Sequence, residues 1–231
     1  VCAADDRQMA LDRRYARAML RCDAPPEVSA KQRRRFDSLA RKLEREIGEP
    51  EFRLLRDPAE ISARLEAFLA LEQAGWKGTE GSALACTQGN RQLFAAILKA
   101  GAERGSCELA ELSAGGRVLA ISTQFVGKGR HYGFKTAYDE SCAAYAPGLL
   151  LLDWLSREYA ASGSAHAIDS CSVPGQQPVS RLWADRCELV DCRVALGGEL
   201  RQAAMRALLG GEIAYAALKR GLAGTPRPLE T

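Results

Sequence analysis

The chain has 231 residues, of which 47% are apolar and 26% are charged, a balance that is ordinary for a soluble globular domain with or without a helical extension. Its net charge of +3 is too small to indicate a polyanionic partner, so we expect no nucleic-acid ligand. No apolar run reaches the roughly 20 residues of a membrane span. No signal peptide is evident, although a sequence that starts at Val1 leaves open whether an upstream segment was removed.

The eight cysteines do not form a metal-binding pattern. No CxxC motif is present and the histidines are His131 and His166, so a zinc site has few ligands to draw on and we expect no metal. We expect buried, reduced thiols in a reducing compartment, which favours the cytoplasm over a disulfide-forming environment.

The first part of the chain is predicted to be helical. Apolar residues recur from Arg7 to Cys22 as on one side of a helix, and Asp23 to Pro26 would end it. A second helix is expected from Ser29, which can form a capping box with Gln32, to about Ile47. Acidic residues interrupt its many Lys and Arg. A solvated helix with internal ion pairs is therefore favoured over contact with nucleic acid, a membrane surface or phosphates.

A strand and two more helices follow. Glu51 to Arg56 is the predicted strand. Asp57 can cap the next helix with Pro58 at its first position, and apolar residues continue at helical spacing. A loop is expected from Gly75 to Gly81, and another helix from Arg91 to Ala102.

The middle of the chain is predicted to be an antiparallel meander. Apolar and polar residues alternate along it, and glycine-containing turns separate its strands. The expected strands are Cys107 to Leu112, Arg117 to Val126 and Arg130 to Tyr138.

An apolar helix then leads from the third strand of the meander to a fourth strand. Pro147 and Gly148 open this helix, which we expect to run to about Ala161, and Ala165 to Asp169 follows as a short strand. A helical crossover favours parallel pairing of the strands that it joins. The sequence therefore predicts an α+β (mixed α/β) fold. Its sheet is mostly antiparallel, has one parallel pair that splays where the pairing changes, and is flanked by helices.

The end of the chain adds a last strand and a last helix. A proline-rich loop and a turn at Ser180 to Trp183 precede the strand, which is expected from Cys187 to Leu196. The helix is expected from Glu199 to Arg220, kinked at Gly210 and Gly211.

The most informative stretch is the end of the third strand and the helix start after it. Tyr132 to Glu140 reads YGFKTAYDE, and Tyr145 to Leu152 reads YAPGLLLL. Pro147 presets the helical backbone, and Gly148 lets a ligand approach the main chain closely. Free amides and the positive end of the helix dipole can then bind phosphate, although this spacing is also typical of an ordinary helix start.

This run resembles the corresponding part of the GNAT superfamily of N-acetyltransferases, in the CelD-like branch, which is related to the Fem peptidoglycan transferases. The matching features are a KTAYD segment, Lys135 to Asp139 here, and a PGLLL helix start from Pro147. The resemblance extends from Ser29 to Trp183, and includes the helix end FLALE at Phe68 to Glu72 and the loop GWKG at Gly75 to Gly78.

The resemblance implies acetyl-CoA or another acyl-CoA as co-substrate, with direct transfer to the acceptor and no covalent enzyme intermediate. The pantetheine would lie in the splay between the third and fourth strands. Main-chain donors near Lys135 would polarise the thioester carbonyl as an oxyanion hole does. The residues expected to bind the cofactor are Thr136, Ala137, Pro147, Gly148, Leu149 and Leu150.

Direct transfer needs a base for the acceptor and often an acid for the leaving thiolate. Asp169 is the first candidate base, with a capping carboxylate as the alternative. Lys135 can position substrate or stabilise charge, or be merely solvated. Tyr138 can act as an acid or simply pack.

Three further residues are candidates for lining the substrate pocket, namely Gln124, Trp76 and His131. His131 lies next to a turn, so an exposed side chain is its alternative. A nucleophilic role for Cys171 is disfavoured because no partner histidine is assured. Related chains often carry a Tyr-Lys pair in the loop after the fourth strand. Val173 to Trp183 has none here, and Arg181 takes that place.

These features predict an acyl-CoA-dependent acyltransferase acting on the amine or hydroxyl of a small-molecule acceptor, for which the branch points to a cell-envelope or polysaccharide precursor. The alternatives are a Fem-like transferase that uses aminoacyl-tRNA and a non-catalytic binding module of the same fold. We expect a helical extension over residues 1–48 and the acyltransferase domain over 49–231, in the cytoplasm. The oligomeric state is open, a homodimer included.

Overall fold

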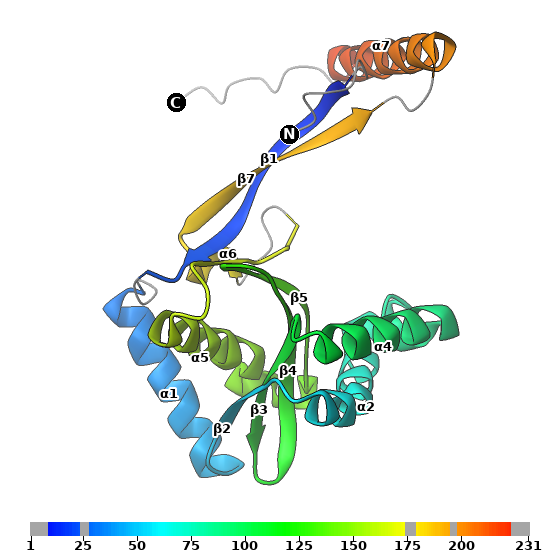
Figure 1. Ribbon diagram of the computed structural model, residues 1–231. Coiled ribbons are helices and arrows are strands. Elements are labelled where there is room, and N and C mark those ends of the chain that lie inside the picture. The colour runs from blue at the N-terminus through cyan, green and yellow to red at the C-terminus, as the bar shows by residue number, and fades with distance from the viewer. Residues whose placement is uncertain (1–8, 24–27, 174–178, 195–197, 223–231) are drawn as a thin grey trace, which may run out of the picture. The chain divides into compact units, whose positions relative to one another are not determined.

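The computed structural model describes residues 9–23, 28–173, 179–194 and 198–222 (Figure 1). It divides into two compact units, one of Ala16–Glu188 and one of Val1–Tyr15 with Leu189–Thr231. The larger unit carries the predicted meander and crossover helix. The proposed division at residue 48 stays a prediction.

A mixed sheet in the order β2-β3-β4-β5-β6-β1-β7 forms the framework. Among the strand pairs with a defined register, β5 and β6 run parallel and the others antiparallel, which confirms the predicted fold class. The strands are β1 (Met9–Arg21), β2 (Glu51–Leu55), β3 (Cys107–Ala114), β4 (Arg117–Val126), β5 (Arg130–Tyr138), β6 (Ala167–Asp169) and β7 (Asp185–Val194).

The helices begin at the caps that the sequence indicates. The Ser29 hydroxyl accepts from the Gln32 amide at 3.2 Å, and the Asp57 carboxylate caps the helix that Pro58 opens. The loop expected at Gly75 contains a short helix, α3. The helices are α1 (Ala30–Glu46), α2 (Pro58–Ala74), α3 (Trp76–Thr79), η1 (Leu84–Cys86), α4 (Gln88–Glu103), η2 (Glu140–Tyr145), α5 (Pro147–Ser162), α6 (Val179–Leu182) and α7 (Glu199–Leu222).

The helix predicted from Arg7 to Cys22 is wrong, because most of this segment is strand β1. Its inner end pairs with β6, Leu20 opposite Ile168, and Ala18, Leu20 and Cys22 are buried at a spacing of two residues. Pairing with a strand about 150 residues away decides the conformation, and local apolar spacing does not report it.

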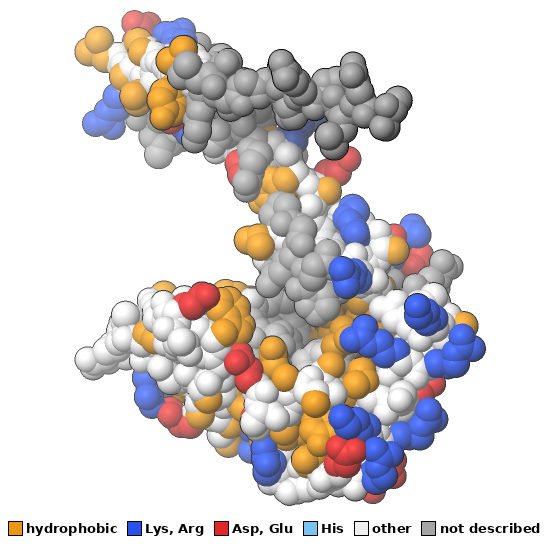
Figure 2. All heavy atoms as spheres, turned by 180° about the vertical axis from the view of Figure 1, so that it is seen from behind, with side chains coloured by type: hydrophobic (Ala, Val, Ile, Leu, Met, Phe, Trp, Pro, Cys, Tyr) orange, Lys and Arg blue, Asp and Glu red, His pale blue; other side chains and the backbone are white. Residues whose placement is uncertain are grey.

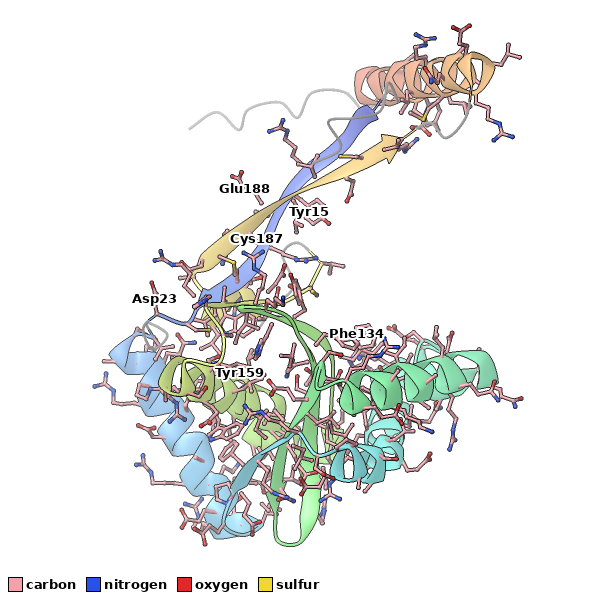
Figure 3. All side chains as sticks on the ribbon, in the orientation of Figure 1. Tyr15, Asp23, Phe134, Tyr159, Cys187 and Glu188 are labelled. Atoms are coloured by element: carbon pink, nitrogen blue, oxygen red, sulfur yellow. The ribbon has the colours of Figure 1, made fainter. Side chains whose placement is uncertain are left out.

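Two helical layers enclose the sheet of the larger unit (Figure 1). Helices α1 and α5 pack on one face around Leu43, Leu151 and Tyr159, and α2 and α4 pack on the other around Phe68 and Phe94. Figure 3 shows Tyr159 on the α5 side of β5 and Phe134 on the α4 side. The end of β5 is thus held between two buried cores, which fixes the position of the candidate site.

Basic side chains gather over α1, as Figure 2 shows. Arg33 Nη1 lies 2.7 Å from Asp153 Oδ2 on α5, and Arg45 Nη2 lies 2.7 Å from Glu46 Oε1. The Arg45–Glu46 pair lies within α1, as the interpretation of a solvated helix with internal ion pairs expects, whereas the Arg33–Asp153 pair joins α1 to α5.

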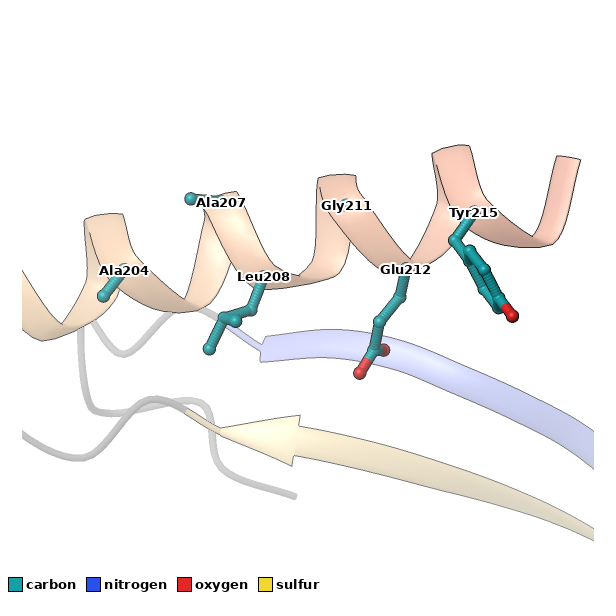
Figure 4. A pocket seen from close by; sticks show the side chains of 6 residues that line it. All are labelled: Ala204, Ala207, Leu208, Gly211, Glu212 and Tyr215. Carbon is teal, nitrogen blue, oxygen red and sulfur yellow. The ribbon is translucent and has the colours of Figure 1, made fainter. Parts of the chain in front are cut away.

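The smaller unit contains α7, which continues through the predicted kink at Gly210 and Gly211 to Leu222. Arg193 Nη1 lies 2.7 Å from Glu212 Oε2 and links β7 to this helix. A shallow, largely apolar hollow follows α7 (Figure 4), lined by Ala204, Ala207, Leu208, Gly211, Glu212 and Tyr215. In the described part of the chain no helix is both long and apolar enough to cross a membrane.

Candidate active site

The parallel strands β5 and β6 separate shortly after they begin. Their pairing covers Arg130–Tyr132 on β5 and Ala167–Asp169 on β6, while β5 continues to Tyr138. Gly133 still lies close to the segment that follows β6, because a Cβ there would come within 3.1 Å of the Ser170 carbonyl oxygen. Beyond Gly133, therefore, β5 has an open backbone edge, which is the predicted splay.

A β-bulge lies at the point of separation. The register of β4 with β5 shifts between Thr123 and Gln124, which leaves Phe134 as the extra residue. The Thr123 hydroxyl bridges the bulge, donating to the Lys135 carbonyl and accepting from the Lys135 amide, both at 3.1 Å. Since the Lys135 amide faces β4, the amide of Thr136 faces the opposite, open edge.

The start of α5 follows η2 and lies next to the end of β5. Ala146 adopts the left-handed conformation, with φ of 50°, and Pro147 is the first helical residue. The amides of Leu149 and Leu150 both donate to the Ala146 carbonyl at 3.0 Å. Pro147 has no N–H, so Gly148 carries the first-turn amide that has no partner among the described residues. Of the residues Pro147 to Leu150, which are expected to bind phosphate, Gly148 is thus the one whose amide is available.

Tyr138 lies between this helix start and the nearby pocket. A Cβ on Gly148 would lie 3.4 Å from Tyr138 Cδ1, which is an ordinary contact. Tyr138 is half-buried, and its hydroxyl has no hydrogen-bond partner among the described residues. The Tyr138 side chain therefore lies beside both the start of α5 and the pocket.

A small pocket lies between the end of α2, α3 and the end of β5, and Trp76 is its most exposed large side chain, at 51%. The Trp76 amide donates to Glu140 Oε1 at 2.8 Å, which ties α3 to η2. The pocket is lined by Leu71, Glu72, Gly75, Trp76, Lys77, Thr136, Ala137, Tyr138 and Glu140.

Two lysines share one buried carboxylate at this pocket. Glu72 Oε1 lies 3.0 Å from Lys77 Nζ and 3.3 Å from Lys135 Nζ, and Glu72 Oε2 accepts the Leu84 amide at 2.8 Å. Burial raises the pKa of Glu72, but the Leu84 and Lys77 hydrogen bonds and the two lysine charges outweigh it, so the pKa is lowered. Glu72 is therefore ionised at neutral pH.

Lys77 also reaches the open edge of β5, where its Nζ donates to the Thr136 carbonyl at 3.4 Å. The predicted residues Lys135, Thr136, Ala137, Tyr138 and Trp76 thus lie within one neighbourhood.

Asp169 lies at the end of β6, as expected, but its carboxylate is already paired. Arg17 Nε lies 2.5 Å from Oδ1 and Arg17 Nη2 lies 2.7 Å from Oδ2, in a fork-like contact. Oδ1 also accepts the Cys171 amide at 3.0 Å, and the side chain is 2% exposed. Such a carboxylate has little capacity left to accept a proton from an acceptor.

His131 and Gln124 lie away from the pocket. His131, expected to line the substrate pocket with an exposed side chain as the alternative, is 2% exposed, because β5 directs it onto Tyr159 with ring centres 4.7 Å apart. Its Nδ1 lies 3.3 Å from Glu108 Oε1. Gln124 is buried and donates to the Ser122 hydroxyl at 2.9 Å. Both belong to a buried polar layer under α5.

The thiols of the described residues form no metal-binding group. The described cysteines are free, but Cys86, Cys171 and Cys192 are exposed, so the expectation that all are buried is wrong for these. Desolvation and the charge of Asp169 raise the pKa of Cys171, which disfavours a nucleophilic thiolate. No group of three or more His, Cys, Asp or Glu in the described part of the chain is placed to hold a metal ion. Arg181 lies in α6, and residues 174–178 of its loop lie outside the described residues.

Sequence reasoning missed Glu72, Lys77, Glu140 and Arg17 as site residues. A signal existed for Glu72, because it follows Phe68 by four residues and Leu69 by three and so continues the apolar stripe of α2. A charged residue at a core position indicates a paired or functional group.

Comparison with known proteins identifies the family. A family model described as an acetyltransferase (GNAT) domain matches residues 30–174. A solved structure of a conserved protein of unknown function from Bacteroides thetaiotaomicron VPI-5482 is 13% identical, with a TM-score of 0.52, over 76% of this chain and 56% of that one. FemX is 11% identical, with a TM-score of 0.51, over 75% of this chain and 59% of that one. No curated protein sequence matches the chain.

At these identities the two structures show a shared fold and nothing finer, and the chain spans less than two thirds of the length of each. The family match covers more than half of the chain and contains β5, its bulge and the start of α5. The chain therefore belongs to the GNAT acetyltransferase family.

Proposed function

We propose that the chain transfers an acetyl or similar acyl group from acyl-CoA to the amine or hydroxyl of a small-molecule acceptor. The observation that supports this most is the open edge of β5 beyond Gly133, with a bulge at Phe134 and the start of α5 at its far end. An extended thioester arm fits beside such an edge, because unpaired backbone groups can hydrogen-bond to it.

In this proposal, the acyl donor binds along β5 and at the start of α5. The pyrophosphate of acyl-CoA contacts the Gly148 amide at the positive end of α5, and the pantetheine follows the open edge of β5. The Thr136 amide donates to the thioester carbonyl, where negative charge develops in the tetrahedral intermediate.

The acceptor occupies the pocket beside Trp76. Its nucleophile attacks the thioester carbon, the carbon–sulfur bond breaks, the acceptor loses one proton and the CoA thiolate gains one. We assign the proton acceptor to Glu140, an exposed carboxylate that lines the pocket, and the proton donor to Tyr138, which touches both Gly148 and the pocket. Asp169, engaged by Arg17, positions the segment after β6.

Two glycines offer a matched test of the donor site. Gly148 and Gly89 are each the second residue of a helix, in α5 and α4, and a Cβ on Gly89 would meet nothing within 4 Å. Leucine at either position suits a helix. In calorimetric titrations with acetyl-CoA, we expect the Gly89→Leu chain to bind like the parent and the Gly148→Leu chain to lose binding. Equal binding by both variants would place the phosphate site elsewhere.

The alternative is a transferase that uses aminoacyl-tRNA as its donor. The structural similarity to FemX supports it, since the Fem-like branch is expected to use aminoacyl-tRNA. The net charge of +3 favours acyl-CoA, because a tRNA ligand needs an extended basic surface. A direct comparison of acetyl-CoA with charged tRNA as donors, followed by mass of the product, separates the two. A non-catalytic binding module would bind acetyl-CoA without turnover on any acceptor.

A further inference from the structure

Three charged side chains, Lys77, Lys135 and Glu72, form a cluster at the acceptor pocket, apart from the Glu140 carboxylate that also lines it. Lys77 and Lys135 contribute two positive charges, and Glu72, the counter-ion of both, contributes one negative charge. The second oxygen of Glu72 accepts the Leu84 amide, so a single oxygen of Glu72 serves both lysines. One positive charge is therefore left over on this cluster of three side chains.

The excess charge lies in a partly dehydrated place. The Glu72 side chain is 1% exposed, and those of Lys77 and Lys135 are 23% and 26% exposed. Two ammonium groups held on one oxygen atom repel each other, and incomplete hydration strengthens this repulsion. A bound anion would relieve it, which makes the cluster a poor structural ion pair and a good anion receptor.

The lysines also have hydrogen-bond donors to spare. An ammonium group has three N–H donors. Lys77 contacts Glu72 and the Thr136 carbonyl, and Lys135 contacts Glu72, among the described residues. At least one donor on Lys77 and two on Lys135 stay available, and Lys77 lines the pocket.

We infer that this cluster recognises a carboxylate group of the acceptor, so that the acyl group is transferred to an amino acid or a similar carboxylate-bearing amine or alcohol. The inference rests on the proposed function for its second half. A carboxylate is favoured over a phosphate because a single excess positive charge matches a monoanion, whereas a phosphate monoester carries nearly two negative charges at neutral pH. The exposed indole of Trp76 offers an apolar surface for the rest of the acceptor.

The test uses matched sets of small molecules on the full chain. The twenty common amino acids, the corresponding amino acid amides and a set of aminophosphonic acids are compared by saturation-transfer NMR and by calorimetry, without and with acetyl-CoA. We expect one or more amino acids to bind, and their amides to bind at least about tenfold more weakly, because a hydrogen bond to a charged group is lost.

Variants of the lysines identify the binding group. Lys77→Gln should weaken amino acid binding about tenfold or more, and Lys77→Arg should restore most of it. Lys99→Gln, at an exposed position on α4, is the control for loss of a lysine and should bind like the parent. If Lys77→Gln fails to fold, Lys135→Gln provides the same comparison, and far-ultraviolet circular dichroism establishes folding for each variant.

Three outcomes would overturn the inference: amides that bind as well as acids, aminophosphonates that bind in place of acids, or no binding by any amino acid. Acetyl-CoA is titrated separately. Amino acid binding without acetyl-CoA binding would contradict the proposed function and leave the carboxylate receptor standing. Acetyl-CoA binding without amino acid binding would do the reverse.

Discussion

Two buried carboxylates at the open end of the sheet differ in how their charge is balanced. Both carboxylate oxygens of Asp169 contact the guanidinium of Arg17. In contrast, one carboxylate oxygen of Glu72 contacts both Lys77 and Lys135. The first pair is complete on the carboxylate side, since both oxygens of Asp169 have a guanidinium partner. The cluster of Glu72, Lys77 and Lys135 has one excess positive charge and several ammonium N–H donors that remain available to a ligand. Burial of a carboxylate therefore does not mark a reactive group, but an unmatched counter-charge marks a binding group.

The largest expected effect comes from opening the complete pair. Arg17→Met leaves Asp169 charged, 2% exposed and without its guanidinium, which should lower the free energy of unfolding by about 3 to 5 kcal/mol. Urea denaturation followed by circular dichroism measures this. Arg34→Met, on the exposed side of α1, is the control and should change stability by less than about 0.5 kcal/mol. A loss below about 1 kcal/mol in Arg17→Met would show that the pair does not hold β1 against β6.

Glu72→Gln tests the incomplete cluster and should cost less, about 2 kcal/mol, because its lysines are partly hydrated and can turn toward water. The same substitution should weaken amino acid binding, since it removes the carboxylate that orients both lysines. A stability loss as large as that of Arg17→Met would mean that the cluster is structural after all.

Much of the proposed donor site can be predicted from the sequence, and little of the proposed acceptor site can. The run from Tyr132 to Leu152 predicts a strand end, a loop and a helix start. The structure has the strand end and the helix start, but the expected loop contains the 3-10 helix η2. These elements are local, and Pro147 with Gly148 specifies the helix start by itself. The charged cluster brings together Glu72, Lys77 and Lys135 from separate elements, and no spacing in the sequence reports that.

Two errors show the same limit. The segment that forms β1 has apolar residues compatible with a helix, and its pairing with β6 decides the outcome. His131 lies beside a turn in the sequence, but the register of β5 directs it inward onto Tyr159. In both cases the deciding partner is remote along the chain.

Thr123→Val should have an intermediate to small effect and tests the bulge that both sides of the site share. The substitution keeps the shape of the side chain and removes the hydroxyl that contacts the Lys135 amide and carbonyl. We expect a loss of about 1 to 2 kcal/mol in thermal or urea unfolding, because both backbone groups lose their partner. Thr123→Ser keeps the hydroxyl and should retain most of the stability, and an equal loss in both variants would point to packing instead.

The smallest expected effect is on the pH dependence of stability. The pKa of Glu72 is lowered in the folded chain, so its contribution is present above the ordinary carboxyl value of 4.5 and is lost as the pH falls through the lowered folded value. The parent chain should therefore lose more stability than Glu72→Gln when the pH is lowered from about 5. Unfolding midpoints between pH 3 and pH 6 measure the difference, and parallel curves for the two chains would refute this assignment.

A crystal structure of the chain with acetyl-CoA would test the proposed acyl-CoA site at β5 and α5 most directly. We expect the pyrophosphate at the Gly148 amide, the pantetheine along the open edge of β5 and the thioester carbonyl within hydrogen-bond distance of the Thr136 amide. An acetyl-CoA molecule bound away from β5 and α5, or a chain that takes up none, would contradict this proposal.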